Sequence, residues 1–404
     1  MSSGDSGRHN ALVLSGMQAL GGANPALVVA LSSLVGQQLA SSPELATLPV
    51  TTFNLGLALG ILPAIFMMQR IGRKQAYLLG AILGIGGGLL ATWGIYIASF
   101  TIFCLGVALA GCYASYVQNY RFAAADGAND EFRPKATSWV LAGGLLGAVI
   151  ASQTIIWTSD LTPLHPFMAS FFSQAVLAAC VIPLVLLLRA KSLGSTSRHT
   201  GPYQGRPLKE IARQPRFIVA VLAGVASYGL MNFMMTASPL AMIGCGHSIT
   251  DSTLGIQWHI LAMFGPSFIT GNLIKRFGQI PITMIGLLLI GAASAVALTG
   301  LSVNHFWLSL ILLGVGWNFG FIGATNMVIS CYRPVERSRV QALNDFIVFG
   351  CVALSSFSSG QVLAKYGWDV INQGSFPIVI ALLCALSWLW RHESRSPASH
   401  TTTA

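Results

Sequence analysis

The 404-residue sequence contains very little charge. Asp, Glu, Lys and Arg together make up 8% of its residues, whereas an ordinary soluble domain carries about 25%. Hydrophobic residues account for 54% of the chain. So few charged side chains cannot cover a surface that faces water on all sides, and the composition therefore excludes a soluble globular protein.

Several chemical motifs are missing as well. The seven cysteines are scattered without CxxC or CxxH spacing, which argues against a disulfide framework and a zinc site. The sequence has no HExxH, no GxSxG, and no P-loop, because its glycine run at 84–88 lies inside an apolar segment with no GK[ST] after it. We therefore expect neither an enzyme nor a protein that binds a metal, a cofactor or ATP.

Apolar runs recur along the whole chain. Each is roughly 20 residues long, enough to cross the hydrocarbon core of a membrane as a helix, and none shows the alternation of a membrane β-barrel. We predict an all-α membrane protein with twelve transmembrane helices in two six-helix bundles. The twelve runs lie near residues 11–38, 46–68, 75–97, 100–121, 136–158, 166–188, 215–240, 252–274, 280–300, 305–330, 341–362 and 373–390.

The basic residues are distributed unevenly between the loops. If the N-terminus is cytoplasmic, 21 of the 22 Lys and Arg residues fall on inner segments and only Lys365 lies outside. Such an asymmetry predicts an integral, multi-pass protein of a bacterial-type inner (plasma) membrane with both termini in the cytoplasm. It also accounts for the net charge of +10, so we expect contact with the lipid bilayer and no nucleic-acid partner.

The chain divides into two related halves. Residues 189–214 are rich in Gly, Ser, Pro and basic residues, which is typical of a linker, here cytoplasmic, between an N-terminal bundle (1–188) and a C-terminal bundle (215–404). A shift of 206 positions places QRIG at 69–72 on KRFG at 275–278. Repeats of this kind are typical of transporters that open a midplane site to each side in turn.

Six plus six helices and the short loop RIGRK (70–74) resemble the major facilitator superfamily over essentially the whole chain. The loop pattern of that family, GxLADRxGRK, is matched in part by IFMMQRIGRK at 65–74 and GNLIKRFGQI at 271–280. The resemblance implies secondary active transport of a small organic solute by alternating access, by a monomer. Proton coupling and the direction of transport stay open. The alternative is a receptor or assembly protein that keeps the fold without transporting.

The resemblance also implies an inner gate, in which the loops switch between conformations. Gln69 stands where the family has aspartate, and Asp345 is the only acid inside a predicted span. Asp345 is either a gate acid that pairs with Arg70 or Arg121, or a water-exposed residue at a helix start. The candidate gate residues are Gln69, Arg70, Gly72, Arg73, Lys74, Arg276, Gly278 and Asp345.

Other polar and aromatic residues within the runs are candidates for the substrate cavity or for proton coupling. His259 is either a proton carrier or an interhelical hydrogen-bonding residue, and Arg121 is either a substrate cation or a helix-end anchor. The mixture of polar and aromatic side chains favours a small organic solute over a bare ion. These candidates are Arg121, His259, Asn119, Tyr120, Trp258, Trp317, Asn318 and Asn344.

Overall fold

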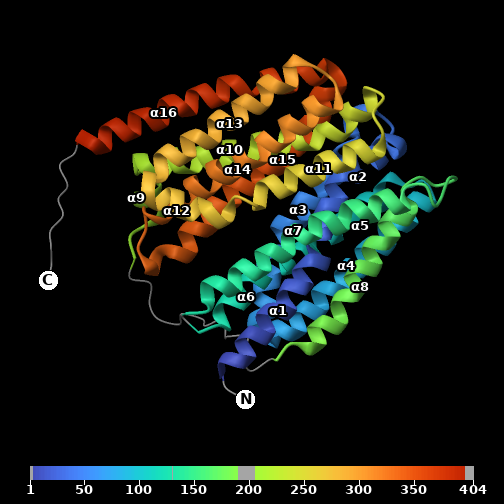
Figure 1. The fold of residues 1–404 in the computed structure, drawn as a ribbon, viewed down its shortest axis with the longest axis horizontal. Coiled ribbons are helices and arrows are strands. Elements are labelled where there is room, and N and C mark those ends of the chain that lie inside the picture. Colours follow the sequence, from blue (N-terminus) through green and yellow to red (C-terminus); the bar gives the residue numbers. More distant parts are fainter. Residues whose placement is uncertain (1–2, 130, 190–204, 396–404) are drawn as a thin grey trace.

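The computed structural model describes residues 3–129, 131–189 and 205–395, and every regular element in those ranges is a helix. The helices form two groups that lie side by side, and both chain termini lie at the same end of the molecule (Figure 1). We call that end the terminal end and the opposite one the distal end. The all-helical prediction is confirmed for these residues. The predicted linker lies largely outside them.

The N-terminal group contains eight α-helices and one short 3-10 helix. Their bounds are α1 (Ser3–Gly21), α2 (Ala23–Leu39), η1 (Pro43–Leu45), α3 (Leu48–Ile71), α4 (Arg73–Tyr96), α5 (Phe100–Val117), α6 (Tyr120–Asp126), α7 (Arg133–Thr158) and α8 (Met168–Leu187).

The C-terminal group is built in a similar way. Its elements are α9 (Leu208–Ala212), α10 (Pro215–Gly244), α11 (Ile249–Phe264), α12 (Ser267–Phe277), α13 (Gln279–Thr299), α14 (Val303–Ile329), η3 (Pro334–Glu336), α15 (Arg337–Gln373) and α16 (Ser375–Arg395).

Ten stretches of the described chain are long and apolar enough to cross a membrane. One of them, Arg339–Ser394, has 56 residues and contains the non-helical Gly367, so it is long enough for two crossings. The consecutive helices α11 and α12 add a crossing that is broken at Pro266, a residue that interrupts a helix because it has no N–H. The fold is consistent with the twelve predicted helices.

The two related loops have the same backbone conformation. Gly72 joins α3 to α4 with φ 84° and ψ 158°, and Gly278 joins α12 to α13 with φ 90° and ψ 164°. This region of conformational space is open to glycine and essentially closed to residues with a Cβ. The repeat read from the sequence thus corresponds to a repeated turn.

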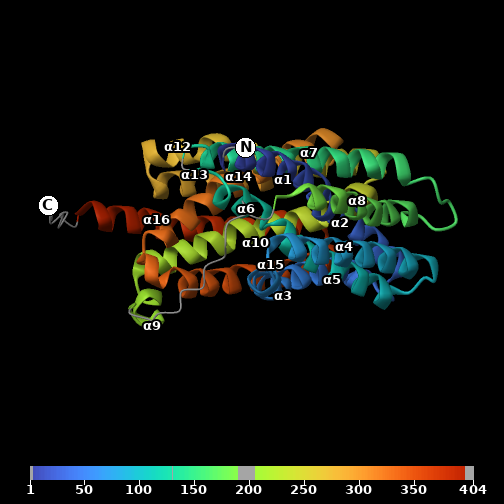
Figure 2. The same cartoon turned by 90° about the horizontal axis from the view of Figure 1, so that it is seen from below.

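Contacts between the two groups gather toward the distal end. The backbone N–H of Gly360 in α15 donates to Thr47 Oγ1 at 3.2 Å, and Asn54 Nδ2 in α3 donates to Ser356 Oγ at 3.2 Å. Helices α3 and α15 lie beside one another (Figures 1 and 2). The larger hydrophobic core includes residues of both groups, such as Phe53 and Met235, so the two groups are joined there by apolar packing as well.

A buried ion pair fixes the start of the C-terminal group. The Glu336 carboxylate is fully buried and accepts hydrogen bonds from the backbone N–H, Nε and Nη2 of Arg206 at 2.8 to 2.9 Å. It also accepts from the Arg333 backbone N–H at 2.9 Å. Donation by Arg206 lowers the pKa of Glu336 to about 2. The segment before α9 is therefore held against the turn that opens α15.

We expect Glu336→Gln to lower the melting temperature at pH 7, because the substitution removes the buried charge that accepts three hydrogen bonds from Arg206. A carboxylate with a lowered pKa stabilises the fold above its unfolded pKa near 4.5 and loses that contribution as the pH falls toward about 2. The difference between variant and wild type should thus be constant from about pH 8 to 6 and shrink below about pH 4.5. Thermal unfolding in detergent across this pH range is the measurement. A difference that varies between pH 6 and 8 would contradict the assignment.

Candidate functional site

Five aromatic side chains from four helices form one cluster in the C-terminal group. Tyr228 of α10 lies at its centre, with ring centroids 5.4 Å from Trp317, 5.1 Å from Phe321 and 5.8 Å from Phe349. Trp317 is stacked on Phe321 at 5.4 Å and has Phe264 at 5.9 Å. Edge-to-face and stacked pairs of this kind stabilise one another. We refer to these five residues as the aromatic cluster.

Two charged residues from opposite groups lie next to this cluster. Arg121 of α6 interacts electrostatically with both Tyr228 and Asp345. Asp345 is exposed and lies one helical turn before Phe349, a member of the cluster, on the same face of α15. Arg121 is also exposed, and neither residue forms an ion pair within the described chain. Arg121 lies over the ring of Phe122, 4.8 Å from its centroid. Each group thus contributes one charged side chain that is accessible to water.

The two cations that follow Gly72 are bonded to partners inside the N-terminal group. Arg73 is buried, and its Nη2 lies 2.5 Å from Asp126 Oδ2 at the end of α6. Lys74 Nζ donates to the carbonyl oxygens of Leu186 and Leu188 at 2.7 and 2.8 Å. These bonds satisfy carbonyls at the end of α8, where a helix favours a nearby cation. Both residues tie α4 to its neighbours.

The remaining residues of the gate loops are exposed at the terminal end. Gln69, Arg70 and Arg276 have exposed side chains, and none forms a hydrogen bond or ion pair in the part of the chain that the structure describes. Arg70 and Arg276 lie over the rings of Phe66 and Phe277, at 5.9 and 5.2 Å from the centroids. Gln69, Arg70 and Arg276 therefore form no polar bond between the two groups at the terminal end of the described chain, whereas hydrogen bonds join the groups at the distal end.

Asn318 closes the break between α11 and α12. Its Nδ2 donates to the Met263 carbonyl at 2.6 Å and to Ser267 Oγ at 2.7 Å. Thr270 Oγ1 donates to Asn318 Oδ1 at 2.5 Å. Because α11 ends at Phe264, the Met263 carbonyl has no helical N–H partner and would otherwise be unsatisfied in the apolar interior. Asn318 is fully buried, and this geometry supports a structural role for it.

His259 is likewise buried between helices. Its Nδ1 donates to the Leu310 carbonyl of α14 at 2.7 Å, and its Nε2 has no partner in the described chain. This arrangement favours interhelical bonding over proton transfer. Asn119 donates to the Ser115 carbonyl within its own chain segment, and Asn344 donates to Asp345 Oδ1 at 3.1 Å.

Two aromatic candidates lie outside the cluster. Tyr120 is buried against Tyr77, with ring centroids 4.9 Å apart, inside the N-terminal group. Trp258 is 42% exposed and makes no ring contact among the described residues. Of the predicted cavity aromatics in this set, only Trp317 belongs to the aromatic cluster.

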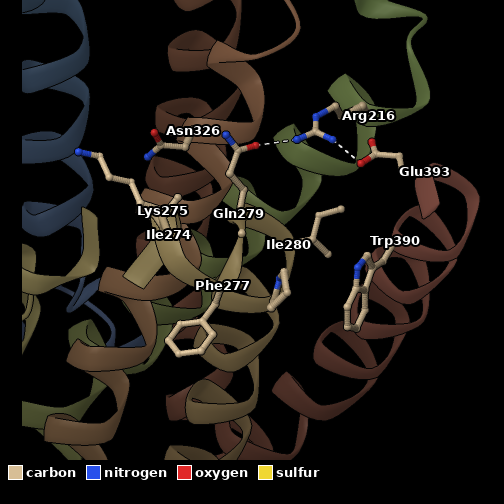
Figure 3. A pocket seen from close by; sticks show the side chains of 11 residues that line it. Arg216, Ile274, Lys275, Phe277, Gln279, Ile280, Asn326, Trp390 and Glu393 are labelled. Carbon is tan, nitrogen blue, oxygen red and sulfur yellow. Dashed lines mark hydrogen bonds and ion pairs between the residues drawn. The ribbon is translucent and has the colours of Figure 1, made fainter. Parts of the chain in front are cut away.

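A separate cavity of about 570 Å³ lies at the terminal end of the C-terminal group. Figure 3 shows Arg216 between Gln279 and Glu393, with Lys275 pointing away from them. Arg216 Nη2 donates to Gln279 Oε1 at 2.6 Å and Nη1 contacts Glu393. The residue that aligns with Arg73 in the repeat is Gln279, so this network occupies the place of the Arg73–Asp126 pair. It joins α10, α13 and α16.

The sequence reading missed three members of the aromatic cluster, Phe264, Phe321 and Phe349. A signal was present, because Trp317 and Phe321 are four residues apart and so are Asp345 and Phe349. Residues at this spacing share a helix face. The sequence does not reveal that these two faces and Tyr228 converge, because convergence depends on how the helices pack.

The fold and the paired glycine turns define a multi-pass membrane protein built from two related groups of helices. A family model for the Major Facilitator Superfamily matches residues 12–347 and 259–404. The chain belongs to this family.

Relatives and solved structures agree with this assignment. The riboflavin transporter RfnT of Brucella anthropi is 53% identical over 96% of this chain and 97% of its own length. The MFS-type transporter YddS of Bacillus subtilis is 26% identical over 93% of this chain and 89% of its own length.

Among solved structures, the xylose transporter XylE from E. coli superimposes with a TM-score of 0.71 at 14% identity, covering 99% of this chain and 100% of that one. The nucleoside transporter NupG gives the same TM-score and identity and covers 94% of this chain and 100% of that one. These structures share the fold, and with the relatives they identify the chain as a secondary transporter of a small molecule.

The distal contact yields a test of conformational change. A Cβ on Gly360 would lie 2.3 Å from Thr47 Oγ1, whereas a Cβ on Gly350 of the same helix meets nothing within 4 Å. We therefore expect Gly360→Val to open the distal end and to close the terminal end, and Gly350→Val to change neither. The measurement is the distance between spin labels at positions 69 and 275, in protein without its native cysteines. Identical distance distributions in both variants and the parent protein would rule this out.

Proposed function

We propose that this protein transports riboflavin, or a flavin with the same ring system, across a bacterial inner membrane. The observation that carries the proposal is the 53% identity to the riboflavin transporter RfnT over nearly the full length of both chains. The aromatic cluster supports it from the structure. Riboflavin combines a flat three-ring system with a hydroxyl-rich ribityl chain, and aromatic side chains bind flat rings by stacking.

The proposed binding position lies between the two groups, against the aromatic cluster. Tyr228 and Phe349 are half-buried and offer ring surface from the C-terminal group. Arg121 of the N-terminal group interacts electrostatically with Tyr228. The ring system would stack on the cluster, and the guanidinium of Arg121 would donate hydrogen bonds to the ring carbonyl oxygens, which are acceptors. No metal or cofactor takes part in the proposed transport, and no bond is made or broken.

Alternating access is the proposed mechanism. The bundles 1–188 and 215–404, joined by the linker 189–214, would rock about the binding position and open the terminal and distal ends in turn. The terminal end would face the cytoplasm, as the distribution of basic residues predicts. In the described state Thr47 and Gly360 form the distal contact. Gln69, Arg70 and Arg276 have exposed side chains at the terminal end.

Asp345 is the proposed gate acid. Gln69 brings no charge to the position where the family has aspartate, and Asp345 interacts electrostatically with Arg121 of the other group. Closure of the terminal end would bring the two charges together and exclude the water around them. As the only acid within a predicted span, Asp345 is also the proposed site of proton coupling. The protein would work as a monomer, because each chain holds both groups.

The substrate proposal is tested by uptake and binding of riboflavin. Purified protein in liposomes should accumulate riboflavin faster than empty liposomes do, and flavin fluorescence should be quenched on binding. Trp317→Ala should weaken riboflavin binding about tenfold, or roughly 1.4 kcal/mol, because the buried ring that holds Tyr228 and Phe321 in place is lost.

The matched control is Trp390→Ala, which removes a tryptophan from the separate cavity in Figure 3 and should leave riboflavin binding unchanged. Saturable uptake of an unrelated solute, with no quenching by riboflavin, would overturn the substrate assignment. Equal loss of binding in both tryptophan variants would remove the aromatic cluster from the binding position.

The gate proposal is tested by comparing two charge-neutralising variants of α15. Asp345→Asn should slow riboflavin uptake several-fold, because the cation facing position 345 loses its counter-charge. Lys365→Gln changes an exposed residue near the distal end of the same helix and should leave uptake unchanged. Initial uptake rates in liposomes at equal protein density are the measurement. Equal rates in the two variants would remove Asp345 from the mechanism.

A further inference from the structure

The cavity at the terminal end of the C-terminal group has a polar half and an apolar half. Its volume is about 570 Å³, within the range of roughly 300 to 1,000 Å³ that is typical of small-molecule sites. Helix α16 ends beside this cavity and α13 begins there, and each helix places a polar residue at its end and an apolar one deeper in the membrane. These pairs are Glu393 and Trp390 on α16, and Gln279 and Ile280 on α13 (Figure 3). The lining therefore changes from polar to apolar in the same direction as a bilayer does.

The sequence repeat accounts for the open space. In the N-terminal group Lys74 bridges α4 and the end of α8, because its Nζ donates to the carbonyl oxygens of Leu186 and Leu188. The shift of 206 positions places Ile280 on Lys74. Ile280 is shorter, apolar and buried, so it cannot form the corresponding bridge from α13 to the end of α16. The space between these two helices is therefore left open to a ligand.

The polar half has an excess of positive charge. Arg216 donates to Ser330 Oγ at 3.0 Å and to Gln279 Oε1 at 2.6 Å. It also contacts Glu393, which compensates its charge. Lys275 points away from this network (Figure 3), has an exposed side chain, and forms no hydrogen bond or ion pair in the described part of the chain. The ammonium group of Lys275 is thus available to an anion.

The apolar half is open to the surroundings of the protein. Phe277 is 53% exposed and Trp390 is 52% exposed. Exposed rings of this size on a membrane protein contact lipid, and Trp is enriched at the boundary between headgroups and acyl chains. Two exposed cations lie beside them, Arg276 over the ring of Phe277 at 5.2 Å and Arg391 next to Trp390 in the sequence. A ligand in this cavity therefore meets both ring surface and positive charge.

We propose that this cavity binds an anionic phospholipid of the inner leaflet. The headgroup phosphate would accept a hydrogen bond from Lys275, and the acyl chains would pass Trp390 and Phe277 into the bilayer. Anionic lipids gather in the cytoplasmic leaflet, and basic pockets between helices on that side bind their headgroups. A soluble phosphate ester would satisfy the cation but would leave the exposed rings without an apolar partner. The inference concerns a second ligand and does not depend on the transported substrate.

The experiment compares phosphatidylglycerol, which carries one negative charge, with zwitterionic phosphatidylcholine of the same acyl chains. Native mass spectrometry of the purified full-length protein gives the dissociation constant of the first lipid that binds. One Lys near a membrane surface strengthens binding to an anionic lipid about fivefold, so wild type should prefer phosphatidylglycerol by at least that factor. Lys275→Gln should reduce this preference about fivefold.

Two further variants separate charge from apolar contact. Trp390→Ala removes ring surface and should weaken the binding of both lipids by a similar factor, which leaves the preference unchanged. Lys209→Gln is the matched control, because it removes an exposed lysine that does not line the cavity and should leave both affinities unchanged.

Equal affinity of wild type for the two lipids would overturn the inference. So would an equal preference in Lys275→Gln and Lys209→Gln, or unchanged affinities in Trp390→Ala. Displacement of phosphatidylglycerol by glycerol 3-phosphate at equal concentration would assign the cavity to a soluble phosphate ester and would overturn the lipid assignment. Riboflavin binding measured on the same samples reports on the proposed function alone, so a failure of either proposal can be told from a failure of the other.

Discussion

Every backbone N–H and carbonyl in a membrane must find a partner inside the protein, and this requirement decides what the polar side chains of this chain do. Wherever a helix is broken, a side chain must satisfy the backbone groups or bridge the helices that meet there. Asn318 does so at Pro266. Near the break between α1 and α2, Asn24 Nδ2 donates to the Ala110 carbonyl at 2.9 Å and its Oδ1 accepts from Gln174. These buried Asn and Gln side chains therefore serve to hold the fold together.

The occupied amides leave a small set of side chains for transport. Arg121 and Asp345 are exposed, charged and without an ion-pair partner in the described chain. Charged groups within membrane spans are costly, so these two residues are the candidates for acting on a substrate, a proton or a gate. By contrast, Arg73 at the start of α4 is buried and paired with Asp126 at the end of α6, and this pair holds the two helices together.

The two halves of the chain show how one backbone can be supported by different charges. Gly72 and Gly278 have nearly the same dihedral angles. After Gly72 the chain places a cation, Arg73, against an acid from α6. After Gly278 it places the neutral Gln279, and the cation comes from α10 as Arg216. Glycine is required at the turn by its dihedral angles, whereas a stabilising ion pair can be built from several directions. The weak sequence repeat is explained by this difference.

The positions of the helices could be predicted well from sequence, because the length of an apolar run is a local property. The predicted run at 75–97 corresponds to α4 (Arg73–Tyr96), and the run at 252–274 corresponds to α11 and α12, although the break at Pro266 was not predicted. The candidate site was harder. Elimination found Asp345 and Arg121 because charge within an apolar span is visible in the sequence. It could not separate Trp317, which joins the cluster, from Asn318, its neighbour, which faces the helix break.

The origin of Arg121 and Asp345 in different groups limits what their pairing can do. A buried ion pair gains Coulomb energy but loses hydration, and the two terms nearly cancel. Pairing of these residues would therefore add little to the stability of a state closed at the terminal end. A single unpaired charge buried in such a state would be strongly unfavourable. Closure is therefore compatible with both side chains charged or with both neutral. In the proposed mechanism the pair would therefore act mainly by disfavouring states that bury only one of the two charges.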